Sequence, residues 1–176
     1  IINYNLNKFA RVRMTQNKNY ASKMFNIALY QPEIPQNTAA IIRLCSCLNT
    51  NLEIIEPCGF QLEDKRIKRV AMDYLDTKKI SRYESFDNFI KNKKNSRVIL
   101  MTTKSKIIYH EFNFKPNDTI LLGRESSGVP KAVHETVSKS LKVPLNKNAR
   151  SLNISTVAAI VLAEALRQNS FFKYVS

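Results

Sequence analysis

Short apolar runs alternate with amphipathic stretches along most of the chain. The apolar runs are typical of strands, which we predict at residues 25–30, 52–56, 97–103, 119–123 and 141–145, with a weaker one at 80–83. The amphipathic stretches have helical spacing, and we predict helices at residues 38–48, 63–73, 86–91, 131–137 and 152–168. Because the strands are apolar at nearly every position and the helices lie between them, the pattern predicts an α/β domain with a largely parallel sheet covered on both faces.

One domain accounts for residues 24–176, since no linker, repeat or low-complexity tract interrupts the pattern there. Residues 1–23 precede it and carry lysines and arginines but no acid, so we interpret them as a basic N-terminal extension. A weak organellar targeting peptide is the alternative interpretation of this segment.

The net charge indicates which kinds of partner the chain can bind, and the cysteine pattern indicates whether it holds a metal or disulfides. Lys and Arg number 28 against 14 Asp and Glu, a formal net charge of +14 that favours RNA, DNA or an anionic membrane surface as partner. The longest apolar run, residues 157–163, is too short for a membrane span of about 20 residues. The three cysteines form no CxxC pair and the two histidines lie far from them in sequence, so we expect no metal site and no disulfide framework. Reduced thiols favour a cytoplasmic location.

The glycines direct attention to one late loop. The loop after the first strand, residues 31–36, has no glycine, which argues against a dinucleotide-binding turn and a phosphate-binding P-loop. Two of the three glycines, Gly123 and Gly128, follow the strand at 119–123. Glycine permits close approach to the backbone, so we expect a ligand at this loop.

Three polar segments carry the candidate chemistry, and each also has a plain structural explanation. Residues 37–43 begin with Asn37 as a helix N-cap and place Arg43 about two turns later, where it can hold a phosphate or be an exposed surface cation. Residues 123–130 form either a ligand loop or a tight turn with Pro130 at the first helical position. Residues 150–155 precede the last helix, and Ser151 or Asn153 can serve as its N-cap. Cys45 and Cys47 are expected to be small buried residues and His134 a surface residue.

Taken together, these segments resemble the motif set of the SPOUT superfamily of RNA methyltransferases. The match is closest to the small tRNA 2′-O-methyltransferases of the TrmL type, which act on the wobble nucleotide, position 34, a cytidine or a modified uridine. The resemblance covers residues 24 to about 169 and rests on residues 26–30, 32–35, 37–43, 54–57, 59–60, 64–66, 102–104, 123–130 and 150–155. It implies an α/β fold in which the C-terminal segment threads through a loop as a trefoil knot, an exception to the rule that chains are not knotted.

The resemblance also implies the site residues. S-adenosylmethionine is expected to be bound by Met101, Gly123, Val143 and Ser151. Arg43 is expected to engage the ribose 2′-hydroxyl, oriented by four further residues: Asn37, Glu125, Ser151 and Asn153. Because a guanidinium is a poor proton acceptor, we expect Arg43 to stabilise the developing alkoxide rather than to act as a base.

One departure from the family pattern leaves alternatives open. The first motif usually reads Asn-x-Gly-Asn-x-x-Arg, whereas Ala39 and Ala40 occupy the glycine and second asparagine positions here. A basic RNA-binding protein without catalysis therefore remains an alternative to the tRNA enzyme. A related enzyme of the superfamily that acts on ribosomal RNA is a second alternative.

The expected partners are tRNA and a second copy of the chain. Basic residues of the second helix are candidates for contact with tRNA phosphates: Lys65, Arg66, Lys68 and Arg69. They can also form an ordinary solvated face. The last helix is apolar on nearly every side between residues 157 and 163, which predicts a homodimer interface. The resemblance implies the same interface and places Arg43 of one subunit at the cofactor of the other.

Overall fold

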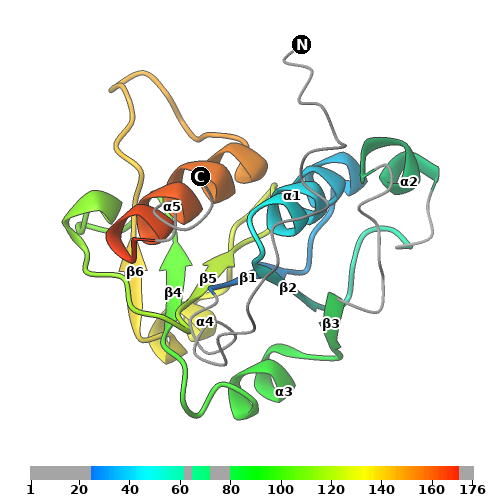
Figure 1. The fold of residues 1–176 in the computed structure, drawn as a ribbon, viewed down its shortest axis with the longest axis horizontal. Coiled ribbons are helices and arrows are strands. Elements are labelled where there is room, and N and C mark those ends of the chain that lie inside the picture. The colour runs from blue at the N-terminus through cyan, green and yellow to red at the C-terminus, as the bar shows by residue number, and fades with distance from the viewer. Residues whose placement is uncertain (1–24, 62–64, 72–79, 171–176) are drawn as a thin grey trace, which may run out of the picture.

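The computed structural model describes residues 25–61, 65–71 and 80–170, and they form a six-stranded parallel sheet with helices on both faces (Figure 1). The strands are β1 (Asn26–Tyr30), β2 (Asn51–Ile55), β3 (Ile80–Tyr83), β4 (Val98–Met101), β5 (Thr119–Leu122) and β6 (Lys139–Leu141), in the order β3-β2-β1-β5-β4-β6. The helices are α1 (Pro35–Cys47), α2 (Lys65–Ala71), α3 (Phe86–Lys91), α4 (Lys131–Thr136) and α5 (Ile154–Gln168), with a short 3₁₀ helix at Tyr109–Glu111. Every strand pair is parallel, which confirms the predicted sheet type.

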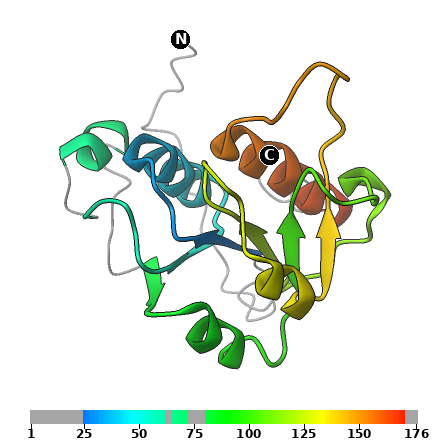
Figure 2. The ribbon, with the colours of Figure 1, turned by 180° about the vertical axis from the view of Figure 1, so that it is seen from behind.

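Alternate residues of each strand enter two separate apolar cores. In β1, Ile27 and Leu29 belong to the larger core, which α1, α2 and α5 cover, whereas Ala28 and Tyr30 belong to the smaller core under α3 and α4. Figures 1 and 2 show the two helix layers from opposite sides. Burial on both faces explains why the strands lack the alternation of a half-exposed sheet.

The amino ends of β4 and β5 are held together by a buried ion pair. Asp118 is 1% exposed, and its carboxylate accepts hydrogen bonds from Arg97 Nε at 2.7 Å and Nη2 at 2.5 Å. The same carboxylate accepts a bond from the Lys115 backbone N–H at 2.8 Å. These contacts fix the residues that precede β4 and β5. The loops at the opposite, carboxyl end of the sheet are not involved in them.

Three predicted boundaries are wrong. The last strand covers Lys139–Leu141 rather than residues 141–145, because Pro144 has no N–H to donate to a neighbouring strand. Helix α1 begins at Pro35, so Asn37 lies inside the helix and is not its N-cap. Pro130 is the N-cap of α4 rather than its first helical residue. Asn153 does cap α5, accepting a hydrogen bond from Ser155 N at 2.8 Å.

Helix α5 buries one stripe and leaves a second one open. Its buried residues recur at helical spacing: Ala158, Val161, Leu162, Ala165 and Leu166. Ala159 and Ile160 are only partly buried and Ala163 is exposed. The sheet and its neighbouring helices therefore cover part of the apolar surface of α5 but not all of it.

Some predictions fall outside the described residues. These are the basic extension at residues 1–23, the predicted ends of α2 at Glu63 and Asp73, and the last residues of the domain, 171–176. Within the described ranges, no helix is long and apolar enough to cross a membrane.

Candidate active site

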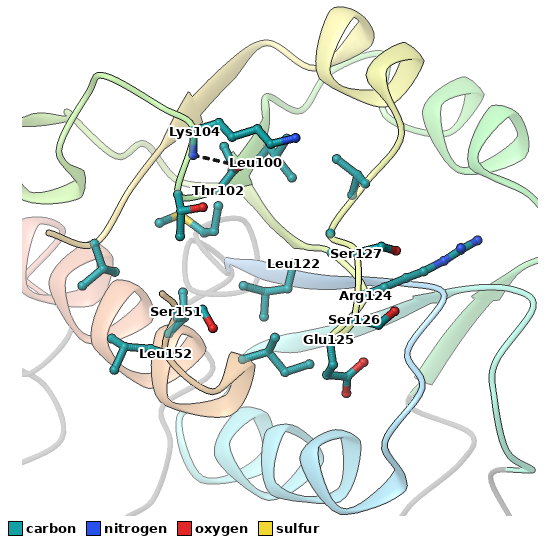
Figure 3. Close-up of a pocket in the computed structure, with 18 of the residues that line it drawn as sticks. Leu100, Thr102, Lys104, Leu122, Arg124, Glu125, Ser126, Ser127, Ser151 and Leu152 are labelled. Atoms are coloured by element: carbon teal, nitrogen blue, oxygen red, sulfur yellow. Dashed lines mark hydrogen bonds between the residues drawn. The ribbon is translucent and has the colours of Figure 1, made fainter. Parts of the chain in front are cut away.

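A cavity of about 290 Å³ opens at the carboxyl ends of β4 and β5 (Figure 3). Its floor and one side are apolar, with Leu100, Met101 and Leu122 from the strands and Val143 and Leu152 from the segment between β6 and α5. Polar groups come from the ends of these loops: Thr102, Thr103, Ser126, Ser127 and Ser151. An apolar interior with a few polar groups suits a ligand that is part apolar and part polar.

The glycine loop that forms one wall is closed on itself. Arg124 N donates to Gly128 O at 2.9 Å and Gly128 N donates to Arg124 O at 3.0 Å. Gly128 has φ +69°, a left-handed conformation that glycine adopts without strain. A Cβ on Gly123 would lie 2.7 Å from the carbonyl carbon of Gly128. The close approach of Gly128 therefore requires glycine at position 123, which supports the tight-turn explanation of this loop, while Gly123 also lines the cavity.

Glu125 of this loop caps helix α1 from a distance. Ile34, the N-cap residue of α1, offers no side-chain acceptor. The Glu125 carboxylate takes that role, accepting bonds from Glu33 N at 2.9 Å and Ile34 N at 3.2 Å. It also accepts a bond from Asn37 Nδ2 at 3.1 Å. The start of α1 thus depends on a residue about 90 positions later in the chain.

The Glu33 side chain forms hydrogen bonds with the same glycine loop. Its carboxylate accepts bonds from Ser126 N and Ser126 Oγ, both at 2.9 Å. The Ser126 backbone N–H and hydroxyl, helped by the Arg124 cation, hold the pKa of Glu33 below its ordinary value. The two glutamates therefore fasten residues 33–37 to the glycine loop reciprocally.

Asn37 and Asn153 extend this network to the start of α5. Asn153 Nδ2 donates to Asn37 Oδ1 at 2.8 Å, and Asn153 Oδ1 accepts bonds from the backbone N–H and hydroxyl of Ser155. Asn37 is 8% exposed, and both ends of its amide are bonded. The three polar segments singled out in the sequence are thus joined by one chain of hydrogen bonds.

The side chain of Arg124, the cation of the glycine loop, is directed away from the cavity centre. Arg124 is bonded through Nη2 to Gln31 Oε1 and lies 5.6 Å from the centre of the Tyr30 ring. In Figure 3 its side chain extends outward from the loop, whereas Glu125 points toward α1. Arg124 therefore adds a third contact between the glycine loop and the end of β1.

The structure brings together most of the predicted site residues. Met101, Gly123, Val143 and Ser151 all line the cavity, as does Glu125. Asn37 and Asn153 are bonded to one another beside it. Arg43 is exposed on α1 and is not among the residues that line the cavity of its own chain.

Several residues of the cavity wall were not assigned to the site from the sequence, among them Lys104 and His134. Lys104 lines the rim, and its backbone N–H donates to Thr102 Oγ1 at 3.3 Å. His134 is half-buried and lines the cavity from α4, so its interpretation as a surface residue is wrong. The available signal was its position less than two turns after the glycine loop.

The predicted RNA-contact residues and cysteines are placed as follows. Lys65, Arg66 and Arg69 are exposed on α2, which packs against α1, and the side chain of Lys68 lies outside the described residues. Cys45 is buried, which raises its thiol pKa to about 12, whereas Cys47 is exposed, contrary to expectation. Over the described ranges, no three His, Cys, Asp or Glu side chains are grouped to hold a metal ion.

Comparisons with known proteins agree on one family. The model of the SpoU rRNA Methylase family matches residues 24–163. A tRNA (cytidine(34)-2′-O)-methyltransferase from Beijerinckia indica is 46% identical over 144 residues, which are 81% of this chain and 90% of that protein. A solved structure from work on the 2-OH methylation of C/U34 on tRNA has a TM-score of 0.80 at 32% identity, covering 85% of this chain and 98% of the other. An AdoMet-bound rRNA methyltransferase from Sinorhizobium meliloti shares the fold, with a TM-score of 0.76 at 21% identity over 83% of this chain and 57% of the other.

Proposed function

The chain belongs to the SpoU rRNA methylase family, and we propose that it transfers a methyl group from S-adenosylmethionine to the ribose 2′-hydroxyl of nucleotide 34 of tRNA. The observation that carries this proposal is the meeting of three distant segments, residues 33–37, 123–128 and 151–155, beside one cavity. The Beijerinckia indica relative is named for the 2′-O-methylation of cytidine 34 of tRNA, and a solved structure with the same fold comes from work on C/U34 of tRNA.

The cavity suits S-adenosylmethionine in size and in chemistry. Its volume of about 290 Å³ lies near the lower end of ordinary small-molecule sites, and it is open to solvent on one side. Leu100, Met101 and Val143 offer an apolar surface for an adenine ring, while Thr102 and Ser151 offer hydrogen bonds. When bound, S-adenosylmethionine supplies the sulfonium methyl group. Gly123 keeps the glycine loop closed, so that this wall is already formed before binding.

The hydrogen-bond network positions the groups that would face the ribose. Glu125 accepts three N–H bonds and so fixes the start of α1, the helix that carries Arg43. Asn37 and Asn153 tie that start to the cavity wall at residues 151–155. Arg43 would hold the 2′-hydroxyl and stabilise its developing negative charge, since a guanidinium remains protonated. In well-oriented intramolecular reactions, positioning of this kind supplies about 7 to 11 kcal/mol of the barrier reduction.

A second copy of the chain would complete this site. Arg43 lies outside the cavity of its own subunit, so a partner that places its Arg43 at the cavity mouth would supply the missing cation. The open stripe of α5, with Ala159, Ile160 and Ala163, supports such a homodimer, because small side chains permit close helix approach. Exposed Ile34 and Leu152 add apolar surface near the same network.

We also propose that the C-terminal segment forms the trefoil knot of the family. After β6, Lys142 is bonded to Ile107 and Tyr109 of the long loop between β4 and β5. Helix α5 then returns to that loop, where Gln168 Nε2 donates to Phe112 O at 3.0 Å. The loop therefore contacts the segment on both sides of residues 143–153, as a threaded chain requires.

With tRNA as substrate, we place the protein in the cytoplasm.

The departure at Ala39 and Ala40 does not favour the non-catalytic alternative. Ala39 is fully buried in the larger core, so its side chain packs against the sheet rather than facing a substrate, and only Ala40, which is half-buried, leaves this alternative open. We also propose that the basic residues of α2 contact the phosphates of the tRNA.

Nucleoside mass spectrometry tests the proposal. Purified protein is incubated with S-adenosylmethionine and either total tRNA or ribosomal RNA, and 2′-O-methylated nucleosides are mapped to positions. We expect methylation of tRNA at nucleotide 34. Methylation of ribosomal RNA alone would support the alternative substrate, and no transfer together with unchanged RNA binding would support the non-catalytic protein.

A further inference from the structure

The outer edge of the sheet beside β6 is formed by two segments that contain no acidic residue. Residues 102–110 follow β4 and residues 139–153 include β6, and neither segment has an aspartate or glutamate. They lie side by side, because Lys142 N donates to Ile107 O at 2.9 Å and Tyr109 N donates to Lys142 O at 3.0 Å. Figures 1 and 2 show the 142–153 segment standing out from the body at this edge.

The two segments carry six cations, of which Lys139 is the first residue of β6, at the amino end of the sheet. We call the other five the β6 edge: Lys104, Lys106, Lys142, Lys147 and Arg150. All are exposed except Lys142, which is half-buried. None of them forms an ion pair with another residue of the ranges 25–61, 65–71 and 80–170. Glu125, which lines the cavity, accepts its hydrogen bonds from the start of α1 and pairs with none of the five cations. Within the described ranges, no ion pair therefore offsets the positive charge of the edge.

The β6 edge leads directly into the candidate active site. Lys104 lines the cavity, and Lys142 and Arg150 each adjoin a lining residue, Val143 and Ser151. An extended polyanion on this edge would therefore reach the cavity mouth without crossing another surface.

The same edge also presents apolar and aromatic side chains beside its cations. Ile107 is 39% exposed, and the exposed His110 ring lies 5.3 Å from the Tyr109 ring in an edge-to-face arrangement. Nucleic-acid surfaces typically combine cations for phosphates with aromatic or apolar groups for bases. A membrane surface would require a larger apolar patch than the single Ile107 side chain.

We infer that the β6 edge binds the phosphodiester backbone of the RNA next to the nucleotide whose ribose reaches the cavity mouth. This inference rests on the proposed function for the identity of the polyanion. It adds a second RNA contact to the basic face of α2, which lies beside α1 rather than at the cavity. Contacts to phosphates position the RNA and set its salt dependence without reading sequence.

Two triple variants with equal loss of charge test the inference. The edge variant carries Lys106→Gln, Lys142→Gln and Lys147→Gln. The control variant carries Lys91→Gln, Lys94→Gln and Lys115→Gln, which are exposed lysines near the opposite, amino end of β4 and β5. Binding of tRNA is measured by fluorescence anisotropy between about 50 and 200 mM salt, and S-adenosylmethionine binding by calorimetry.

We expect the edge variant to bind tRNA at least about tenfold more weakly, with a log K against log[salt] slope smaller by about 2 to 3. The control variant should keep the wild-type slope within about 1, and both should bind S-adenosylmethionine as the wild type does. If the edge variant proves unstable, Lys147→Gln alone, in an exposed turn, should lower the slope by about 1.

Three outcomes would overturn the inference. The first is a wild-type slope for the edge variant. The second is an equal fall in both triple variants, which would show an effect of net charge only. The third is unchanged tRNA binding with lost binding to anionic vesicles. Failure of the proposed function would instead appear in the wild type, as absent methyl transfer or absent S-adenosylmethionine binding, and would leave the difference between the two slopes intact.

Discussion

The two ends of the parallel sheet are built by different kinds of contact. At the amino end, Arg97 pairs with Asp118, 21 positions away, and Ser96 Oγ donates to Asn117 O at 2.5 Å over the same distance in sequence. At the carboxyl end, Glu33 is joined to Glu125 and Asn37 to Asn153, partners that lie 92 and 116 positions apart. These two amino-end contacts lie within one strand connection, and Asn26 adds longer-range bonds to Asp118 O and Thr119 Oγ1, whereas the carboxyl end is assembled from three connections around a cavity.

This difference separates stability from function. The Arg97–Asp118 and Ser96–Asn117 contacts need only β4 and β5 to be in register. The long-range network requires the whole fold, and its distortion changes the cavity directly. We therefore expect substitutions at the amino end to lower the free energy of unfolding, and substitutions at the carboxyl end to alter cofactor binding and methyl transfer.

Loss of Arg43, which lies outside both ends, should have the largest effect. Arg43→Ala removes the cation proposed to stabilise the ribose oxygen, so methyl transfer should fall about 100- to 1000-fold. Because Arg43 does not line the cavity of its own chain, S-adenosylmethionine affinity should change less than twofold. Single-turnover transfer and calorimetry measure the two quantities. Transfer at the wild-type rate would remove Arg43 from the mechanism.

Asp118→Asn should weaken the ion pair at the amino end of β4 and β5 and so lower the free energy of unfolding. The substitution leaves Arg97 and the Lys115 N–H with a weaker acceptor in a buried position, and we expect a loss of about 3 kcal/mol in the free energy of unfolding. Urea denaturation measures this loss. Well below the melting temperature, cofactor affinity should stay unchanged, and a parallel fall in affinity would show that the two ends are not separable.

Gly123→Ala and Gly128→Ala should distinguish two reasons for glycine in one loop. At Gly123 the added Cβ meets Gly128 backbone at 2.7 Å, so the cavity wall must move and S-adenosylmethionine affinity should fall about tenfold, or about 1.4 kcal/mol. At Gly128 the space is open and only the positive φ is strained, at a cost of about 1 kcal/mol in unfolding free energy. Equal cofactor affinities for both variants would contradict this distinction.

The smallest effect is expected from pH acting on Glu33. Its pKa is lower in the folded protein than its ordinary value of 4.5, so its ionised form stabilises the fold at higher pH. That contribution is complete above pH 4.5 and is lost as the pH falls through the lowered pKa. Glu33→Gln should therefore reduce the dependence of the melting temperature on pH below about 4.5. Identical profiles for variant and wild type would place the acid sensitivity elsewhere.

Local patterns in the sequence were enough for most of the fold. The weak strand at 80–83 and the helix at 86–91 have the predicted bounds, because strand and helix periods are local properties. The last strand was misplaced because Lys139 and Ser140 belong to an edge strand, where polar residues are tolerated. The three polar segments were also identified from the sequence, and the structure brings them together.

What escaped prediction depends on contacts between distant residues. Asn37 suits an N-cap by type, but Glu125 provides the cap from another loop, and no local pattern reports such a contact. Gly123 was linked to a ligand, whereas its nearest constraint is the Gly128 backbone. His134 has ordinary sequence surroundings and reaches the cavity only through the packing of α4, whereas Lys104 belongs to the 102–104 segment of the resemblance but was given no role at the site.

Hydrogen exchange with and without S-adenosylmethionine tests most directly whether the carboxyl-end loops form the cofactor site. We predict that the ligand slows exchange in residues 101–104, 123–128 and 142–152, and leaves residues 94–97 and 113–118 at the amino end unchanged. Protection confined to the amino end, or none in the three loops at saturating ligand, would contradict the account.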